Sequence, residues 1–313
     1  MKKITKRKNI KRPKKLSIMT SPLNNAIASG NVHSVKELLK QGVDPNEFTN
    51  VWCSSTMEPW IQYTGVLCKP GGKNNDIGTS IQLALYLRHT DIIHMLLGVG
   101  GVDIHKQYRK YDKTTLQLSV SCGLDIVKKV YEKGCTDVNH VDFEGHTALI
   151  DAVWHKYAPQ VDSRLDIIRY LIDKKSNVNY KDDTKGWTAL ELACKLGHID
   201  VIKYLLIKGA HINNINKRGR TPLHEAIISD QTNSNSNKDK VVALLLRKGA
   251  KVNTLSNDTN SSPLLSATYY GLVNIVKLLV GHGAHKKTKD IHKMTPLEVG
   301  RMNGFHSIVK LLA

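Results

Sequence analysis

Apolar residues recur along this chain in short groups at nearly regular intervals. Each group has a leucine or isoleucine anchor: Leu23, Ile81, Leu116, Leu149, Leu190, Leu223, Leu264 and Leu297. Four of the seven steps between anchors are 33 to 35 residues long, and the others are 41, 41 and 58 residues. A second apolar run follows each group, as in residues 201–206, so each unit predicts two short helices. A fixed period of this length indicates stacked repeats.

The residue three positions after each anchor is always small. These residues are Ala26, Ala84, Ser119, Ala152, Ala193, Ala226, Ala267 and Gly300. A large side chain there would force neighbouring helices apart, so the column predicts close helix-to-helix packing between successive units.

Helix start and stop signals fall in the same register. Ser21, Thr221, Ser262 and Thr295 each precede a proline, a combination typical of a helix N-cap followed by a first-turn residue. Glycines are expected to end the helices. Gly197 and Gly271 should end first helices, and left-handed residues should follow second helices at Gly209, Gly249 and Gly283.

The phrase Thr-Pro-Leu-His-Glu-Ala at residues 221–226 resembles the signature of the ankyrin repeat family, and seven other copies match it in part. The resemblance covers residues 20–313 and implies an all-α solenoid of about eight stacked helix-turn-helix units with β-turn tips. The repeats are expected near residues 20–46, 78–104, 113–139, 145–179, 186–213, 219–253, 261–285 and 293–313. The first and third copies are degenerate. Insertions are expected near residues 47–77, 156–164 and 229–240.

The resemblance also implies a partner-facing side made of turn tips and first helices, and the candidate contacts are the positions at which the copies differ. They are aromatic and basic: Tyr86, Arg109, Lys110, Tyr111, Lys113, Phe143, His146, Trp154, Lys185, Trp187, Lys217, Arg218, Arg220, Tyr269 and Tyr270. Aromatic and arginine side chains dominate many interfaces, which favours a binding groove between the third and sixth repeats. The alternative is that some rings only pack on a neighbouring turn. His224 is expected to join turn backbones.

Two insertions are interpreted differently. Residues 47–77 hold Trp52, Trp60 and Tyr63, and such a long segment is either a flap that contacts a partner or disordered. Residues 229–240 are polar and of low complexity, which is typical of a solvated loop.

The distribution of charge indicates a second region, a basic segment at the N-terminus. The chain has 313 residues and a net charge of +19, and nine of its 46 Lys and Arg residues lie in residues 1–15, which hold no acid. Residues 1–19 are expected to be a disordered basic tail. It could be a nuclear import signal, a polyanion contact or simply a solvated segment, and its candidate residues are Lys6, Arg7, Lys8, Lys11, Arg12, Lys14 and Lys15.

Several classes of protein are disfavoured. No apolar run approaches the roughly 20 residues of a membrane span, and the five cysteines follow no paired or metal-type spacing. Residues 69–74 lack the spacing of a phosphate loop, and no catalytic motif, metal site or cofactor site is evident. We expect a monomeric, non-catalytic intracellular protein without a cofactor. It would be cytoplasmic, nuclear or both, within the host cell if the source is a virus or an intracellular bacterium.

These observations predict a protein–protein interaction module or adaptor. Its partner would offer acidic and apolar side chains to the concave groove and the turn tips. The alternative is nucleic-acid or other polyanion binding through the basic tail and the basic turn tips.

Overall fold

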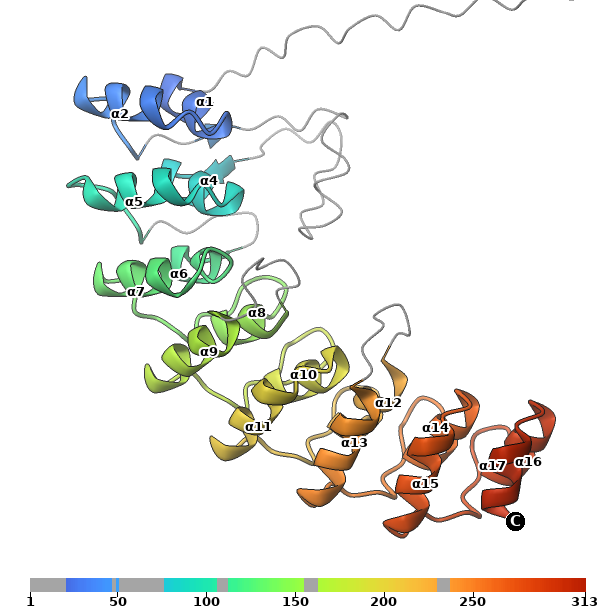
Figure 1. Ribbon diagram of the computed structural model, residues 1–313. Coiled ribbons are helices and arrows are strands. Elements are labelled where there is room, and N and C mark those ends of the chain that lie inside the picture. Colours follow the sequence, from blue (N-terminus) through green and yellow to red (C-terminus); the bar gives the residue numbers. More distant parts are fainter. Residues whose placement is uncertain (1–20, 47–48, 51–75, 106–111, 155–162, 230–236) are drawn as a thin grey trace, which may run out of the picture.

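The computed structural model describes residues 21–46, 49–50, 76–105, 112–154, 163–229 and 237–313. These residues form sixteen helices, arranged as eight successive pairs, and two short strands (Figure 1). The first helices of the pairs are α1 (Pro22–Ala28), α4 (Ser80–Leu87), α6 (Thr115–Ser119), α8 (Ala148–Trp154), α10 (Ala189–Leu196), α12 (Pro222–Ile228), α14 (Pro263–Tyr269) and α16 (Pro296–Met302). The second helices are α2 (Val32–Lys40), α5 (Thr90–Gly98), α7 (Leu124–Glu132), α9 (Ser163–Asp173), α11 (Ile199–Ile207), α13 (Lys238–Arg247), α15 (Val273–Gly281) and α17 (His306–Leu312).

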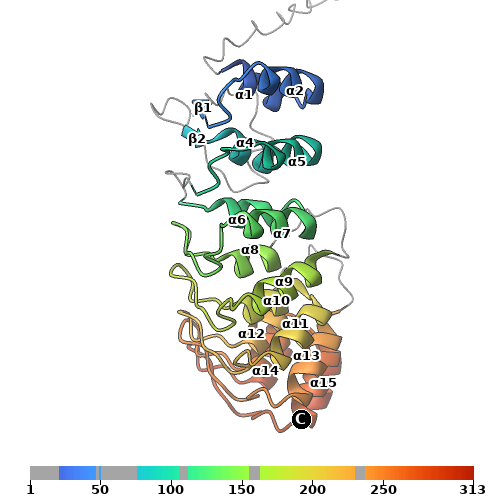
Figure 2. The same cartoon turned by 90° about the vertical axis from the view of Figure 1, so that its left-hand side faces the viewer.

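The pairs stack into a curved array, which confirms the predicted helical solenoid. Each first helix packs on the first helix of the next pair, from α1 on α4 to α14 on α16. The first helices form the inner, concave layer of the array, and the second helices form the outer layer (Figure 1). The turns between pairs project from one side of the stack (Figure 2).

Five of these turns form similar closed loops, here called turn tips: residues 142–146, 182–187, 216–220, 256–261 and 290–294. In each, the backbone N–H of the first residue donates to the carbonyl of the last, at 2.9 to 3.1 Å. Neighbouring tips are also bonded, because the Lys217 N–H donates to the Lys185 carbonyl and the Asn257 N–H donates to the Arg218 carbonyl. With the bond from the Ile291 N–H to the Thr259 carbonyl, the last four tips form one hydrogen-bonded edge.

The core follows the repeat register. Seven of the eight anchors are fully or almost fully buried, whereas Leu297 of the last pair is only partly buried. All eight small residues of the predicted column are buried. A methyl group added at Gly300 would lie 3.3 Å from a methyl carbon of Val309, so even alanine would fit tightly there. The continuous core stabilises every helix pair through its neighbours.

The predicted helix signals are also confirmed. The hydroxyls of Ser21, Ser262 and Thr295 accept hydrogen bonds from backbone N–H groups in the first turns of their helices. Gly197 ends α10 with a φ of 73°, and the glycines that follow α11, α13 and α15 have φ of 82° to 87°. Lys175 occupies the equivalent position after α9 with a φ of 73°, where a side chain is strained.

Asparagines tie the outer turns together. The Asn253 carboxamide donates to the Gly283 carbonyl at 3.1 Å and accepts from the His285 N–H at 2.8 Å. The same two-bond bridge joins adjacent turns at Asn46, Asn139, Asn179 and Asn213. These bridges fix the spacing of successive repeats.

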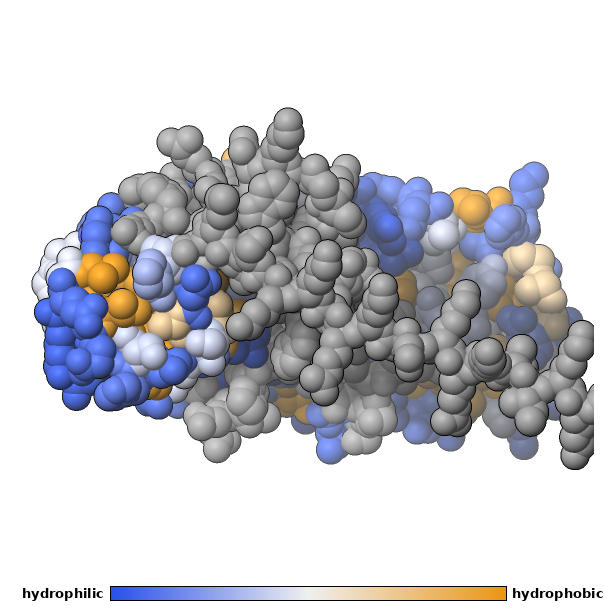
Figure 3. All heavy atoms as spheres, turned by 90° about the horizontal axis from the view of Figure 1, so that it is seen from above, coloured by the Kyte–Doolittle hydropathy of each residue, from blue (hydrophilic) through white to orange (hydrophobic). Residues whose placement is uncertain are grey.

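The predicted insertions differ in how much of them is described. Strands β1 (Thr49–Asn50) and β2 (Asp76–Gly78) pair antiparallel and join the two ends of the 47–77 segment. Helix α9 begins at Ser163 and α13 begins at Lys238, so each starts inside a predicted insertion. Trp52, Trp60, Tyr63 and the basic tail lie outside the described residues. In the view onto the N-terminal end of the stack, apolar side chains of the first pair lie inside a polar outer rim (Figure 3).

Candidate protein-interaction surface

Three candidate side chains, Trp154, Lys185 and Trp187, meet a fourth residue, Lys195, where the fourth and fifth helix pairs adjoin. Trp154 ends α8 and Trp187 closes the turn tip before α10, and their ring centroids are 6.4 Å apart. The ammonium groups of Lys185 and Lys195 lie 4.4 and 4.7 Å from the Trp187 ring centroid. Trp154 is 43% exposed, and Trp187 is partly buried. We call these four residues the Trp patch.

The repeat register explains how the Trp patch forms. Trp154 and Lys195 each lie five positions after an anchor, near the C-terminal ends of neighbouring first helices. The same column holds Tyr86, Ile228, Tyr269 and Met302. Met302 is 63% exposed and Tyr269 is 37% exposed. Lys195, Ile228 and Met302 were missed by the prediction, although their equivalent position in the repeats would have identified them.

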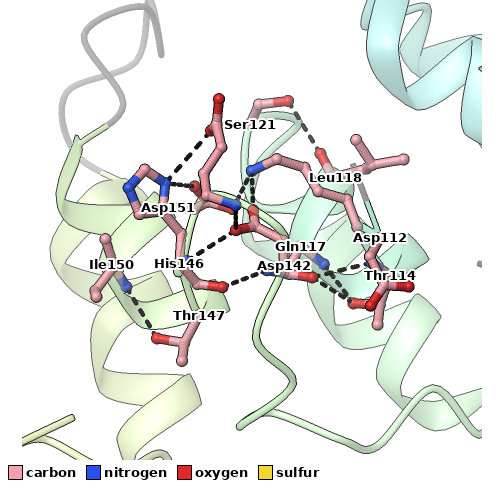
Figure 4. Close-up of polar contacts among 12 residues, drawn as sticks. Asp112, Thr114, Gln117, Leu118, Ser121, Asp142, His146, Thr147, Ile150 and Asp151 are labelled. Carbon is pink, nitrogen blue, oxygen red and sulfur yellow. Dashed lines mark hydrogen bonds and ion pairs between the residues drawn. The ribbon is translucent and has the colours of Figure 1, made fainter. Parts of the chain in front are cut away.

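Lys113 and His146 are partly buried and lie in an ionic cluster with two buried aspartates, Asp142 and Asp151. Figure 4 shows His146 beside the two aspartates. The Lys113 ammonium is 2.8 Å from the Asp142 carboxylate and 2.9 Å from that of Asp151, which joins the third pair to the fourth. The His146 Nδ1 lies 3.6 Å from Asp151 on the other side. Burial raises the pKa of Asp151, but the charges of Lys113 and His146 outweigh burial and lower it to about 2.

The pKa values of the two basic side chains, Lys113 and His146, are both raised. Burial lowers the pKa of Lys113, but the carboxylates of Asp151 and Asp142 raise it above its usual value overall. Burial lowers the pKa of His146, but its hydrogen bond to Asp151 and the charges of Asp151 and Asp142 together raise it above its usual value. The Lys113 ammonium and the His146 imidazole thus face carboxylates within the fold, which leaves them less available to a partner.

Other candidates are divided between paired and exposed side chains. Arg220 forms an ion pair with Asp258 at 2.7 Å, the Lys217 ammonium donates to the Asp183 carbonyl, and the Tyr269 hydroxyl donates to the Asp290 carboxylate. Phe143, Arg218 and Tyr270 are exposed, and Phe143 is 69% exposed. Tyr86 is partly buried. Arg109, Lys110 and Tyr111 lie outside the described residues. Among the candidates that the structure describes, Trp154, Lys185 and Trp187 converge, and Trp154 is the exposed member of that group.

His224 is structural, as predicted. It is fully buried, its Nδ1 lies 3.2 Å from the Thr221 N–H, and its Nε2 lies 3.2 Å from the Ser261 carbonyl of the next repeat. Burial lowers its pKa to about 4. The neutral imidazole therefore links two turn tips.

One group of side chains has spacing compatible with a metal ion. Potential ligand atoms of Asp142, Glu144 and His146 lie within 4.8 Å of one another. Asp142, however, already accepts hydrogen bonds from the Glu144 and His146 N–H groups and pairs with Lys113.

Among the described helices, none is long and apolar enough to cross a membrane.

Comparison with known proteins decides the family. The family model for ankyrin repeats matches three times, at residues 81–182, 160–253 and 233–313. The chain belongs to the ankyrin repeat family. This ankyrin repeat protein is 33% identical over 207 residues to the mouse B-cell lymphoma 3 protein homolog, covering 66% of this chain and 43% of that protein.

Two other relatives show how widely the ankyrin repeats are used. An ankyrin repeat and KH domain-containing protein, mask-1 of Caenorhabditis elegans, is 34% identical over 326 aligned positions, which cover 95% of this chain and 12% of that protein. A putative ankyrin repeat protein of fowlpox virus, FPV031, is 29% identical over 196 residues, which cover 61% of this chain and 54% of that protein. The chain thus spans about half or less of these relatives' lengths. Ankyrin repeats are general protein–protein interaction modules.

Proposed function

We propose that this ankyrin array binds a protein partner along its concave side, with the Trp patch at the centre of the contact. The observation that carries this proposal is the exposed indole of Trp154 beside Trp187, flanked by two ammonium groups. Large aromatic side chains supply much of the binding energy of protein interfaces. Nearby lysines favour a partner that combines apolar and acidic side chains, because carboxylates would pair with Lys185 and Lys195.

The column that contains Trp154 defines the form of the partner more closely. Stacked helices lie about 8 to 10 Å apart, and an extended peptide rises about 3.3 Å per residue. One repeat therefore corresponds to three residues of an extended segment. The partner segment would therefore contact one column residue with every third side chain. Its side chains would be apolar opposite Trp154, acidic opposite Lys195 and apolar opposite Ile228. The side chain opposite Tyr269 could be apolar or polar, because a tyrosine ring accommodates both.

Such binding would suit an adaptor that holds one protein near other machinery in the cytoplasm or the nucleus. A viral relative is an ankyrin repeat protein too, which is compatible with contact to a host protein if this chain has a viral source. The same module performs no chemistry in this proposal, and specificity comes from the concave side chains alone.

A library of displayed 16-residue peptides would test the proposal. Peptides selected on the full chain should carry acidic and apolar side chains at three-residue spacing. Trp187→Ala should weaken binding of the selected peptides, measured by fluorescence anisotropy, by about 30-fold, as for an interface residue worth about 2 kcal/mol.

Tyr204→Ala is the matched control, because Tyr204 is an aromatic residue on outer helix α11 with cations of Arg169 and Lys208 over its ring. It should leave peptide affinity unchanged. Selection of no peptides, or equal weakening by both substitutions, would contradict the proposal.

A further inference from the structure

Charge divides the array into two unlike parts. Residues 16–200 hold 20 Lys and Arg against 21 Asp and Glu, whereas residues 201–313 hold 17 against six. The positive charge of the folded body therefore lies in the last repeats, and it is separate from the basic tail. Since both parts are built of the same helix pairs, the fold alone does not require this difference.

At least four of the six acids of residues 201–313 are buried or bonded to another side chain. Glu225 and Asp290 are buried, Asp258 pairs with Arg220, and Asp239 accepts a hydrogen bond from Asn274. In contrast, Arg247, Lys248, Lys251, Lys286 and Lys287 are all exposed. None of these five has an ion-pair partner among the residues that the structure describes.

These five cations lie on one continuous edge of the outer layer. Arg247 ends α13, and Lys248 and Lys251 follow it, whereas Lys286 and Lys287 follow α15. Helices α13 and α15 pack side by side, and the Asn253 bridge bonds the turn after α13 to the turn after α15. We call Arg247, Lys248, Lys251, Lys286 and Lys287 the basic edge.

One equivalent position shows how the edge becomes basic. This position lies two residues before each bridging asparagine, and His105 and Lys287 take the place of the asparagine in two repeats. Along the chain the position holds Asp44, Asp103, Asp137, Asn177, His211, Lys251 and His285. The first four accept a hydrogen bond from the backbone N–H two residues later, at 2.9 to 3.0 Å. The Lys251 side chain has no acceptor atom, and among the described residues neither histidine side chain accepts this bond. The last repeats thus place basic side chains where the earlier repeats use a turn-stabilising acid or amide.

We infer that the basic edge binds the phosphate backbone of a nucleic acid without selecting its sequence. Cations without an ion-pair partner on successive turns match a long, densely charged polyanion, whose binding releases condensed counterions. Within the described part of the chain, Arg247 and Lys286 each donate only to a backbone carbonyl, which leaves their charge without a matching carboxylate. The five residues offer phosphate contacts but no aromatic side chain on which a base could stack. This site lies on the outer layer, away from the Trp patch, and it involves neither the tail nor the turn tips.

The test measures binding of the full chain to a labelled 20-base-pair duplex of mixed sequence, by anisotropy between 50 and 200 mM salt. The variant Arg247→Gln/Lys248→Gln/Lys251→Gln should bind at least about tenfold more weakly at 50 mM salt. Its slope of log affinity against log salt should be shallower by about 3, because each lost phosphate contact removes about 0.9.

The variant Lys128→Gln/Lys129→Gln/Lys133→Gln is the control, because it removes three exposed cations from α7 and the residue after it, in the neutral part of the array. It should retain most of the affinity and the slope. Equal weakening by both variants, or unchanged binding by the basic-edge variant, would overturn the inference.

Vesicles with 30% anionic lipid provide a competing polyanion. Ile207, which is 77% exposed at the end of the second helix of the preceding repeat, α11, could contact a lipid surface. Basic-edge-dependent binding to vesicles but not to the duplex would replace the nucleic acid by a membrane surface and so contradict the inference.

Discussion

Two buried carboxylates in the concave layer are stabilised in opposite ways. Asp151 on α8 lies between the Lys113 ammonium and the His146 imidazole. Glu191 on α10 has only uncharged donors: the Thr188 N–H at 2.7 Å, the Thr188 hydroxyl at 3.1 Å and the Asn214 amide at 3.0 Å. All three donate to Oε2, and the buried Oε1 has no hydrogen-bond partner among the described residues.

The difference in partners sets the protonation of the two groups. The pKa of Asp151 is about 2, so this carboxyl is ionised throughout the physiological range. Burial raises the pKa of Glu191 to about 7, and the hydrogen bonds from Thr188 and Asn214 offset burial only in part. A buried carboxylate therefore stays ionised where a cation lies beside it, and it shifts towards its neutral form where only dipoles and a second carboxylate, Glu225, are near.

Lys113→Met should have the largest effect on this comparison. It leaves Asp151 without its ammonium partner inside the fold and removes the same partner from Asp142. Loss of one side of a buried ion pair typically costs about 3 to 5 kcal/mol, so the free energy of unfolding at pH 7 should fall by about that amount in urea titrations.

Acid should reveal the same pair in the unsubstituted protein. Because the folded-state pKa of Asp151 lies below its usual 3.8, its stabilisation is present above that pH and is lost as the pH falls towards 2. The loss is about 2 kcal/mol. Lys113→Met should weaken this acid dependence. Lys128→Met, at an exposed lysine of α7, is the control, and an equal effect of both substitutions would refute the assigned role of Lys113.

Glu191→Gln should have a smaller effect, with the opposite dependence on pH. Between its usual pKa of 4.5 and the folded value of about 7, Glu191 binds more protons in the folded state than in the unfolded state. Stability should therefore fall as the pH rises through this range, by up to about 3 kcal/mol. The neutral glutamine removes this loss, so the variant should gain stability relative to the original protein at pH 8 and differ little at pH 5.

Glu298→Gln provides the control at the same position of the last repeat. Glu298 is exposed, and hydrogen bonds from Thr295 lower its pKa, so this substitution should bring no gain at pH 8. Urea unfolding of both variants at pH 5, 6, 7 and 8 measures the difference. The same pH slope in Glu191→Gln as in the original protein would contradict the raised pKa.

The comparison also shows what the sequence could predict. The anchors, the small-residue column and the helix-ending glycines repeat locally, so the sequence predicted the fold and the buried role of His224. The pairing of Lys113 with Asp151 joins residues 38 positions apart, and each of its members varies between repeats, so no repeated pattern marks it. Lys113 was consequently predicted as a partner contact. Trp154 and Trp187 were found as candidates, but their meeting with Lys195 depends on the packing of adjacent repeats.

Lys175→Gly should have the smallest effect, and it tests the turn that joins the repeat of Asp151 to the repeat of Glu191. Lys175 has a φ of 73°, whereas glycines have similar φ at the equivalent positions Gly209, Gly249 and Gly283. A side chain in this left-handed conformation costs about 1 to 2 kcal/mol, and the greater freedom of glycine in the unfolded chain offsets part of the gain. We expect the variant to be more stable by about 0.5 to 1 kcal/mol, seen as a higher urea midpoint at constant slope. Lys175→Ala removes the same charge but keeps the strain, so it should bring no such gain. If alanine stabilised the protein as much as glycine, the effect would belong to the lysine side chain, and the two regions would be joined by a turn without backbone strain.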